Sequence, residues 1–178
     1  MENKRILEKY NAYKLGWLHD SLHFVILIAA AFILFRFVIG LAVVGGDSME
    51  PALQDGTVVL YLRTVRNFQP GDIISMRVPS GAYYVKRVAA VGKDTVDLQD
   101  GHVLVNGETV DDPWAQGETD EETGAVIYPY YVREGNVFVL GDNRVVSMDS
   151  RAFGEVSRRQ IKGKLLLRFG KDGIHRVR

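Results

Sequence analysis

The chain contains no cysteine, which excludes thiolate catalysis, thiolate metal sites and disulfide bonds. Histidine is nearly as scarce, with four residues at His19, His23, His102 and His175. His19 and His23 share a helical face, but the residues between them lack the glutamate of a zinc-protease helix. We therefore expect no metal site and no cofactor, and any catalytic machinery must work without a histidine base.

The chain also lacks an excess of either charge. Its 22 lysines and arginines balance 22 aspartates and glutamates. A neutral chain carries no electrostatic footprint for nucleic acid, so we expect no nucleic-acid partner. With 178 residues, 47% of them hydrophobic and 25% charged, the chain has the composition of an ordered protein with one sizeable domain.

One long apolar run, residues 22–44, follows the N-terminal segment. Its cleanest portion, 22–35, is shorter than the roughly 20 residues that a bilayer-spanning helix needs. Upstream, Trp17 can sit at headgroup level, and downstream Arg36 can snorkel to the interface while 37–39 add another turn. We therefore predict a transmembrane anchor over residues 15–39, preceded by a cytoplasmic segment over residues 1–14.

Two other interpretations of this run stay open. A cleaved signal peptide also places a short apolar core behind a basic segment. Residues 40–46, however, lack a convincing small-x-small cleavage site close behind the core. An amphipathic or buried core helix is the second alternative.

The distribution of basic residues predicts how the anchor is oriented. Lys4, Arg5, Lys9 and Lys14 precede the run, whereas residues 40–60 contain no lysine or arginine. By the positive-inside rule the N-terminus is cytoplasmic and everything after Gly40 is outside. We expect a single-pass protein of the cytoplasmic membrane with an extracytoplasmic domain.

After residue 43 short apolar runs alternate with turn signals, and no long stretch has helical periodicity. The turn signals are Gln-Pro-Gly-Asp at 69–72, Asp-Gly at 100–101 and Asn-Gly at 106–107. The spacing predicts strands at 57–62, 72–78, 83–91, 95–98, 102–105, 136–140 and 164–169. Strands this closely spaced favour a mainly β domain over residues 40–170, an antiparallel β-sandwich or partly closed barrel.

Two further segments are predicted to lie outside regular structure. Residues 111–122 contain six acids and no base, which indicates a solvated loop. Residues 171–178 form a short basic C-terminal tail, which we expect to be frayed.

A glycine-flanked serine follows directly after the apolar run, in Gly-Gly-Asp-Ser-Met-Glu-Pro at 45–51. Small residues before Ser48 allow a sharp turn that presents its hydroxyl and its own N–H together. Acyl transfer needs this arrangement, because the oxyanion forms within hydrogen-bonding distance of the nucleophile. On its own the signal is weak, since glycine-flanked serines are common in ordinary loops.

A lysine lies in the predicted strand 83–91. Alternation along a strand places Tyr84, Lys86 and Val88 on one face, and Arg87 on the other. Lys86 can thus face an apolar interior while Arg87 stays in solvent. Loss of water lowers the pKa of a lysine toward about 7–8, where it can serve as a general base. The alternative is an ordinary solvated lysine.

A third segment, residues 141–154, is denser in hydrogen-bonding side chains than a turn requires. It begins with Asp142 directly after an apolar strand. Ser147 can donate a hydrogen bond to a neutral Lys86 amine and orient its lone pair. Asp149 and Arg151 can form a charge-assisted pair that fixes the loop.

Together these segments resemble the type I signal peptidase family. The matching patterns are Gly-Asp-Ser-Met-x-Pro-x-Leu at 46–53, Tyr-x-Val-Lys-Arg-Val at 83–88 and Gly-Asp-Asn-Arg-x-x-Ser-x-Asp-Ser-Arg-x-x-Gly at 141–154. Val-Asn-Gly at 105–107 and Gln-Pro-Gly-Asp at 69–72 also match. The resemblance covers about residues 37–169, and its last motif is highly specific.

The resemblance implies a membrane-bound serine endopeptidase that cuts signal peptides from exported preproteins after small, Ala-x-Ala-like residues. Ser48 would be the nucleophile and would supply an oxyanion N–H, and Lys86 would be the general base. Ser147, Asp149, Arg151 and, as a further support, Asp142 would hold the site. The partners would be secretory preproteins and the lipid bilayer, and the sequence does not predict an oligomeric state.

Three features depart from the family pattern. Some members have a serine that donates to the oxyanion two positions before the nucleophile. Here that position is Gly46, and many Gram-positive-type members likewise have no serine there. Val-Gly-Lys-Asp at 91–94 replaces a common Leu-Pro-Gly-Asp, which brings Lys93 into consideration as a second lysine near the site. The chain is also compact, without the large insertions of Gram-negative forms.

Two rival functions share some of these features. Self-cleaving repressor-type peptidases have similar Ser-Met and Lys elements, but they carry a DNA-binding domain for which this N-terminus lacks length and charge. A membrane-tethered β binding module, with Ser48 and Lys86 in structural roles, is the non-enzymatic alternative. Acylation of Ser48 by a serine-directed inhibitor would separate the enzyme from the binding module.

Overall fold

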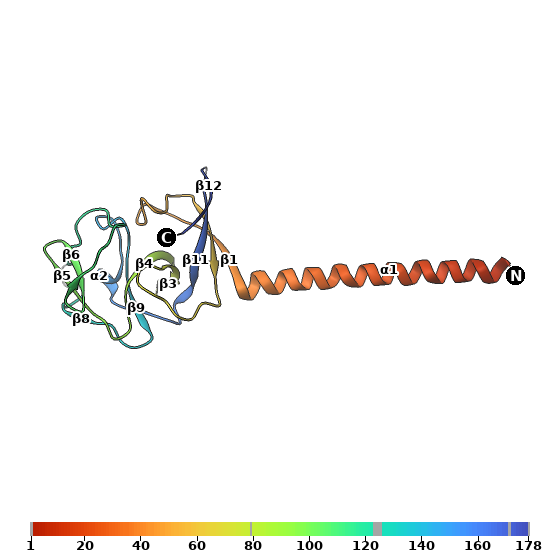
Figure 1. Ribbon diagram of the computed structural model, residues 1–178, viewed down its shortest axis with the longest axis horizontal. Helices are drawn as coiled ribbons and strands as arrows, with labels where there is room; N and C mark the ends of the chain where they lie inside the picture. Colours follow the sequence, from red (N-terminus) through yellow and green to blue (C-terminus); the bar gives the residue numbers. More distant parts are fainter. Residues whose placement is uncertain (1, 79, 123–125, 171, 178) are drawn as a thin grey trace. The chain divides into compact units, whose positions relative to one another are not determined.

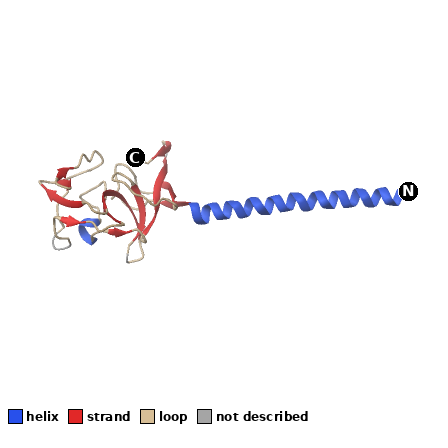
Figure 2. Ribbon diagram, turned by 60° about the horizontal axis from the view of Figure 1, so that its bottom comes forward, coloured by secondary structure: helices blue, strands red, loops and turns tan. Residues whose placement is uncertain are grey.

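The computed structural model describes residues 2–78, 80–122, 126–170 and 172–177. The chain divides into two compact units, one ending at Val38 and the other beginning at Ile39. The first unit is helical, and the second contains every strand of the described chain, as the colouring in Figure 2 shows.

The N-terminal unit is the helix α1 (Glu2–Ile33), followed by a short π-helical turn, η1 (Leu34–Val38). No proline interrupts residues 2–33, which allows one uninterrupted helix. Its segment His19–Val38 has 20 residues and a mean hydropathy of 2.3, and by length and composition it can cross a membrane. The side chains from residue 19 to 37 are exposed, unlike those of a buried core helix.

The second unit is built on a large antiparallel sheet with the order β1-β2-β11-β3-β4-β9-β10, in which β12 pairs with β11. Its strands are β1 (Ile39–Val43), β2 (Val58–Leu62), β3 (Ile73–Arg77), β4 (Tyr83–Val91), β9 (Asn136–Leu140), β10 (Val156–Ser157), β11 (Ile161–Gly170) and β12 (Gly173–Arg176). The described part of this sheet is open, because β1 and β10 end the order without pairing with each other.

A smaller antiparallel sheet has the order β7-β6-β5-β8 and groups together in Figure 1, beside the short helix α2. Its strands are β5 (Thr95–Gln99), β6 (His102–Val105), β7 (Glu108–Thr109) and β8 (Tyr130–Tyr131), and α2 spans Ser150–Phe153. The mainly β fold class with one N-terminal apolar helix is confirmed.

Three hydrophobic clusters hold the second unit together. One, around Met49, Leu53 and Ile73, packs beneath the turn that carries Ser48. The others are centred on Ile74 and Val139, and on Phe138 and Val96. Because alternate strand residues face opposite sides, β9 contributes Phe138 to one cluster and Val139 to another.

All seven strands predicted from the sequence are present, with ends that differ by up to three residues. Two segments differ from expectation. Helical geometry ends at Val38 instead of 39, since Ile39 starts β1 by pairing with Leu62 of β2. The expected frayed tail contains β12, where Gly173 pairs with Gly170 of β11. Asp-Gly at 172–173 is a hairpin signal that the basic composition of the tail obscured.

Candidate active site

A cleft of about 360 Å³ opens beside β1, β3 and β4. Its walls come from β1 and the turn after it, from the first half of β4, and from the loop after β9, which are distant in sequence. The lining residues are Ala42, Val43, Val44, Gly45, Gly46, Asp47, Ser48, Met49, Ser75, Tyr83, Tyr84, Val85, Lys86, Val146 and Met148.

Ser48 lies in the turn that follows β1, and its neighbours fix that turn. Gly46 has a φ of 81°, which favours glycine, and its N–H donates to Asp55 Oδ1 at 2.8 Å. Met49, which directly follows Ser48, is 1% exposed and anchors the turn in the core. From the other side, Asn143 N–H donates to the Ser48 carbonyl at 3.2 Å. The Ser48 hydroxyl is thereby held at the cleft wall.

Lys86 reaches this hydroxyl from β4. Its Nζ donates a hydrogen bond to Ser48 Oγ at 2.7 Å, across 38 residues of sequence. The backbone of Lys86 is opposite Ile74 of β3, and its side chain is only 3% exposed, with Nζ 5.7 Å from the Tyr84 ring centre. The predicted placement of Lys86 on an apolar inner face is thus what the structure shows.

Burial lowers the pKa of Lys86 from 10.5 to about 8, because the charged ammonium loses water. The carboxylates of Asp149 and Asp142 act in the opposite direction, and the Arg151 guanidinium adds to the lowering. Desolvation is the largest of these effects. Lys86 therefore holds a substantial neutral fraction near pH 8, and the neutral amine can accept a proton from Ser48.

Asp149 and Arg151 form the pair that the sequence suggested, and it organises the loop after β9. Asp149 caps α2, accepts from Arg151 Nε at 2.9 Å, and receives the Gly141 N–H at 3.0 Å. Arg151 also donates to the carbonyls of Arg144 at 2.7 Å and Ser147 at 3.3 Å. Since both side chains are at most 4% exposed, the pair braces the whole turn from Gly141 to Arg151.

Ser147 is buried beside the nucleophile, but its hydroxyl oxygen has no hydrogen-bond partner among the described residues. The expected hydrogen bond from Ser147 to Lys86 is therefore absent. The hydroxyl packs against Gly141 instead. A methyl group at Gly141 would collide with Ser147 and with the Ser48 carbonyl, so glycine is required where the two loops meet.

Arg87 was expected in solvent, and this was wrong: the side chain is 4% exposed. Its guanidinium binds both carboxylate oxygens of Asp142 at 2.7 Å and the Gly71 carbonyl at 2.9 Å. It also lies 4.3 Å from the ring centre of Trp114. Alternation along β4 does place Arg87 opposite Lys86, but the loops cover that second face as well. Asp142 and Arg87 thus join the loop after β9 to β4.

Part of the acidic segment 111–122 packs over the face of β4 that carries Arg87. The expectation of a solvated loop was wrong for this part. Asp112 pairs with the buried Arg144, which also binds Thr119, itself 2% exposed. Gln116 forms two backbone hydrogen bonds with the chain at Asp142 and Arg144, of 2.7 and 2.9 Å. Sequence reasoning missed Trp114 and Arg144 because a block of acids normally indicates exposure.

Lys93 does not belong to the cleft. It lies in the turn between β4 and β5, exposed and paired with Glu134 at 2.9 Å. Its φ of 84° shows a tight turn where many family members have glycine. The possibility of a second lysine near the site is therefore excluded by geometry. Within the described ranges, no three His, Asp or Glu side chains gather to hold a metal ion.

Comparison with known proteins agrees with this geometry. The sequence model of a family described as "Signal peptidase, peptidase S26" matches residues 17–169, which include the apolar helix segment and the cleft. The chain belongs to this signal peptidase family. Ser48 and Lys86 thus lie within the matched segment of a peptidase family, and they meet in its cleft.

Individual signal peptidases resemble the chain over most of its length. Signal peptidase IB of Staphylococcus aureus strain N315 is 31% identical over 171 residues, which cover 84% of this chain and 90% of the relative. Signal peptidase I of Bacillus licheniformis is 34% identical over 151 residues, with 78% and 81% covered. A crystal structure of a signal peptidase I from Enterococcus faecalis V583, 28% identical, covers 57% of this chain and 99% of its own, with a TM-score of 0.49.

Proposed function

We propose that this protein is a membrane-bound serine endopeptidase that removes N-terminal signal peptides from exported preproteins with a Ser48–Lys86 dyad. Family membership supports the reaction and the membrane anchor. The observation that carries the dyad is the 2.7 Å contact of Lys86 Nζ with Ser48 Oγ inside a cleft. A buried lysine with a lowered pKa can act as the base that activates a neighbouring serine hydroxyl as the nucleophile.

The reaction proceeds in two halves. Neutral Lys86 takes the Ser48 proton as Oγ attacks the scissile carbonyl, and the resulting ammonium then protonates the leaving amine. This releases the mature protein and leaves the signal peptide as an ester on Ser48. Lys86 next removes a proton from water, and the resulting hydroxide attacks the ester. As the ester breaks, the Lys86 ammonium returns the proton to Ser48 Oγ.

The oxyanion of each tetrahedral intermediate needs donors close to Ser48. The Ser48 N–H donates no hydrogen bond to any described residue, so it is free for this role. Gly46 carries no side chain that could donate. We propose the Ser48 N–H as the first donor.

Asp149, Arg151 and Asp142 act by holding these groups in position. Asp149 and Arg151 fix the loop that presents Asn143 to the Ser48 carbonyl. Asp142, held by Arg87, joins that loop to β4. Ser147 fills the space between Gly141 and Ser48 with a hydroxyl that is free to bind the Lys86 amine or a water once substrate closes the cleft.

Signal peptides would enter the cleft as an extended strand, with alternate side chains in small pockets. The backbone of residues 42–46 and the first half of β4 line the cleft from two sides. The family's preference for small residues at the first and third positions before the cut is the proposed specificity. For the chain as a whole, we propose residues 1–14 in the cytoplasm, residues 15–39 as the anchor and residues 40–170 outside, with 171–178 as a basic C-terminal segment.

A cleavage assay with the full chain in detergent tests this function. A preprotein ending its signal peptide in Ala-x-Ala should be cut directly after the second Ala, as read by N-terminal sequencing of the product. Ser48→Ala and Lys86→Ala should each lose activity by a factor of at least about 10³, and the double variant should lose no more, because the two residues act as a unit.

Ser75→Ala is the matched control, because Ser75 is a buried serine that lines the same cleft and has no side-chain hydrogen bond to Lys86 in the described structure. It should retain activity. Substantial cleavage by Lys86→Ala, or failure of a serine-acylating inhibitor to label Ser48, would contradict the dyad and favour another base or a binding module.

A further inference from the structure

Several basic residues with no acid among them lie at one end of the large sheet, although the whole chain is neutral. The segments 63–68, 77–82 and 157–162 contain six basic residues and no Asp or Glu. We call these six the basic surface: Arg63, Arg66, Arg77, Arg158, Arg159 and Lys162. The turn at the far end of β1 and β2, residues 44–57, has the reverse composition, with three acids and no base.

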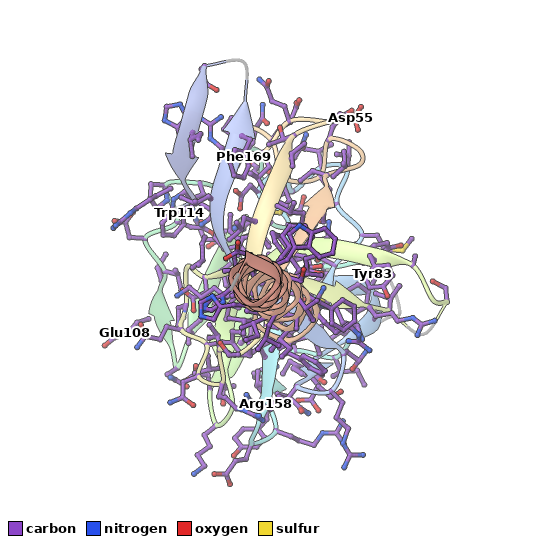
Figure 3. All side chains as sticks on the ribbon, turned by 90° about the vertical axis from the view of Figure 1, so that its right-hand side faces the viewer. Asp55, Tyr83, Glu108, Trp114, Arg158 and Phe169 are labelled. Carbon is purple, nitrogen blue, oxygen red and sulfur yellow. The ribbon has the colours of Figure 1, made fainter. Side chains whose placement is uncertain are left out.

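Strand register places the three segments together. Leu62, at the end of β2, pairs with Ile39 of β1 and with Lys164 near the start of β11. Ile161, which begins β11, is opposite Met76 at the end of β3. The residues of the basic surface therefore lie together at one end of the sheet. In Figure 3, Arg158 and Asp55 lie at opposite edges of the second unit.

These cations are available to a partner. None of the six forms an ion pair with an acid in the described part of the chain, whereas Arg87, Arg144 and Arg151 around the candidate active site each pair with an aspartate. Arg63, Arg66, Arg77 and Arg159 are exposed, and the other two are partly exposed. Arg66 and Arg159 donate no side-chain hydrogen bond within the described ranges.

Three of the arginines line a shared pocket of about 160 Å³, together with Val65, Phe68, Ile161 and Gly163. Arg158 is held there by the Arg66 carbonyl, which it contacts, and by the Phe68 ring, 5.9 Å away. Arg63 stacks 4.9 Å from the Tyr61 ring centre. A small pocket lined by three arginines suits one phosphate group, which accepts several charge-assisted hydrogen bonds.

The pocket is tied to the point where the chain leaves the apolar helix. Arg63 Nε donates to the Ile39 carbonyl at 3.2 Å, and Ile39 directly follows Val38, the last residue of the apolar segment. Chain continuity alone therefore keeps Arg63 within a few ångströms of the end of the segment. If residues 15–39 span the bilayer, this position is at headgroup level.

We propose that the basic surface binds the anionic headgroups of phospholipids at the membrane face from which the chain emerges, with a headgroup phosphate in the arginine pocket. The inference rests on the proposed membrane anchor and adds a second attachment, on the catalytic unit itself. Attraction by unpaired cations next to an anionic surface, worth a factor of about five per cation, favours one orientation of the domain against the membrane.

Single-cysteine labelling of the full chain tests the proposal, since the native chain has no cysteine. Thr64→Cys places a fluorophore between Arg63 and Arg66, and Glu108→Cys, on β7, is the control site. Each protein is reconstituted into nanodiscs of phosphatidylcholine, with or without about 30 mol % phosphatidylglycerol, and with a headgroup spin-labelled lipid as quencher. We expect phosphatidylglycerol to increase quenching at position 64 and to leave position 108 unchanged.

Charge variants separate specific binding from general attraction. In the Thr64→Cys background, Arg66→Glu with Arg159→Glu should shift the docked-to-undocked ratio by at least about 25-fold. Lys93→Glu with Arg176→Glu, at sites outside the basic surface, should leave quenching unchanged. Salt at about 0.5 M should reverse the lipid effect. Equal quenching with and without phosphatidylglycerol, or equal loss in both charge variants, would overturn the proposal.

Peptidase activity in detergent is measured on the same variants. Arg66→Glu with Arg159→Glu should cleave a short peptide substrate as fast as the parent does, because neither residue lines the cleft. If all proteins are inactive, the proposed function fails while the lipid result stands. If the variant has a raised KM in detergent, the basic surface binds substrate and the lipid proposal is wrong.

Discussion

At the scale of single residues, the burial of Lys86 favours its proposed catalytic role but costs stability. A lysine is rarely buried to 3% exposure without a carboxylate partner, and the group it contacts, Ser48, is neutral. The nearby charges partly cancel, since Asp149 and Asp142 oppose Arg151. Burial therefore dominates, and the pKa near 8 results from lost hydration more than from repulsion.

The pH profile of kcat/KM should report this pKa. Lys86 must be neutral to accept the Ser48 proton, so activity should fall as pH drops through about 8. Lys93→Ala should leave the acidic limb in place, because Lys93 is exposed and paired with Glu134 away from the cleft. The measurement is kcat/KM of both proteins on a short peptide from pH 6 to pH 11. A limb near the ordinary lysine value of 10.5 would contradict the buried base.

The same pKa shift predicts that Lys86 costs stability at neutral pH. The unfolded chain binds this proton up to about pH 10.5, and the folded chain only up to about pH 8. Between these values the unfolded state holds more protons, so the free energy of unfolding rises with pH and is lowest below pH 8. Lys86→Met, which keeps the length without the charge, should raise it by about 1–3 kcal/mol at pH 7.

Urea unfolding of both proteins at pH 7 and pH 10 measures this difference. The advantage of Lys86→Met should shrink at pH 10, since most of the penalty has gone there. The Lys93→Met variant controls for loss of a lysine and should show no such gain. A Lys86→Met protein less stable than the parent at pH 7 would show that the ammonium is stabilised by contacts stronger than its desolvation.

At the scale of elements, the site depends on loops that strands bring together. Ser48 follows β1, Lys86 lies on β4, and the Asp149–Arg151 pair follows β9. These three elements are not neighbours in sequence, and β1 is separated from β4 by β2, β11 and β3 in the sheet. The loop after β9 closes the gap, because Asn143 reaches back to the Ser48 carbonyl.

The segment 111–122 supports that loop from outside, and Trp114 is its main apolar contact. Its ring covers the Arg87 guanidinium, which holds Asp142. Trp114→Ala should lower the free energy of unfolding by about 1–3 kcal/mol, as expected for a desolvated cation–π contact plus lost packing. Trp114→Phe should recover most of it, because a ring still covers Arg87.

Chemical denaturation with activity as a second readout tests this prediction. Trp17→Ala, which changes the only other tryptophan, is the control and should leave unfolding of the β unit unchanged. Trp114→Ala should retain measurable cleavage, unlike a dyad variant, because no reacting group is removed. An unaltered unfolding midpoint for Trp114→Ala would mean that segment 111–122 is the solvated loop its charge suggested.

At the scale of the whole molecule, the asymmetry of charge at the two ends of the apolar helix predicts topology. Four basic residues precede residue 22, and residues 40–60 have none. A cysteine at Glu108 should react with a membrane-impermeant maleimide in intact cells, and a cysteine at Asn3 only after the membrane is disrupted. The reverse pattern would place the catalytic unit in the cytoplasm and contradict the proposed orientation.

Much of the fold, and the residues proposed for the active site, could be predicted from the sequence alone. Alternating apolar residues and Asn-Gly, Asp-Gly and Pro-Gly turns specify strands locally, and Ser48, Lys86 and the 141–154 segment stand out by their chemistry. An apolar run of this length likewise predicts a membrane helix whatever surrounds it. Each of these predictions depends only on the chain within a few residues.

Which faces of the strands are buried could not be predicted without the packing of distant segments. Arg87 was expected in solvent because strand alternation gives it the face opposite Lys86, yet Trp114 and Asp142 bury that face from distant segments. Ile39 was predicted as the last residue of the apolar helix, but it pairs with Leu62 and is the first residue of β1. Burial of a polar residue depends on partners from other segments, and local composition does not predict where those segments pack.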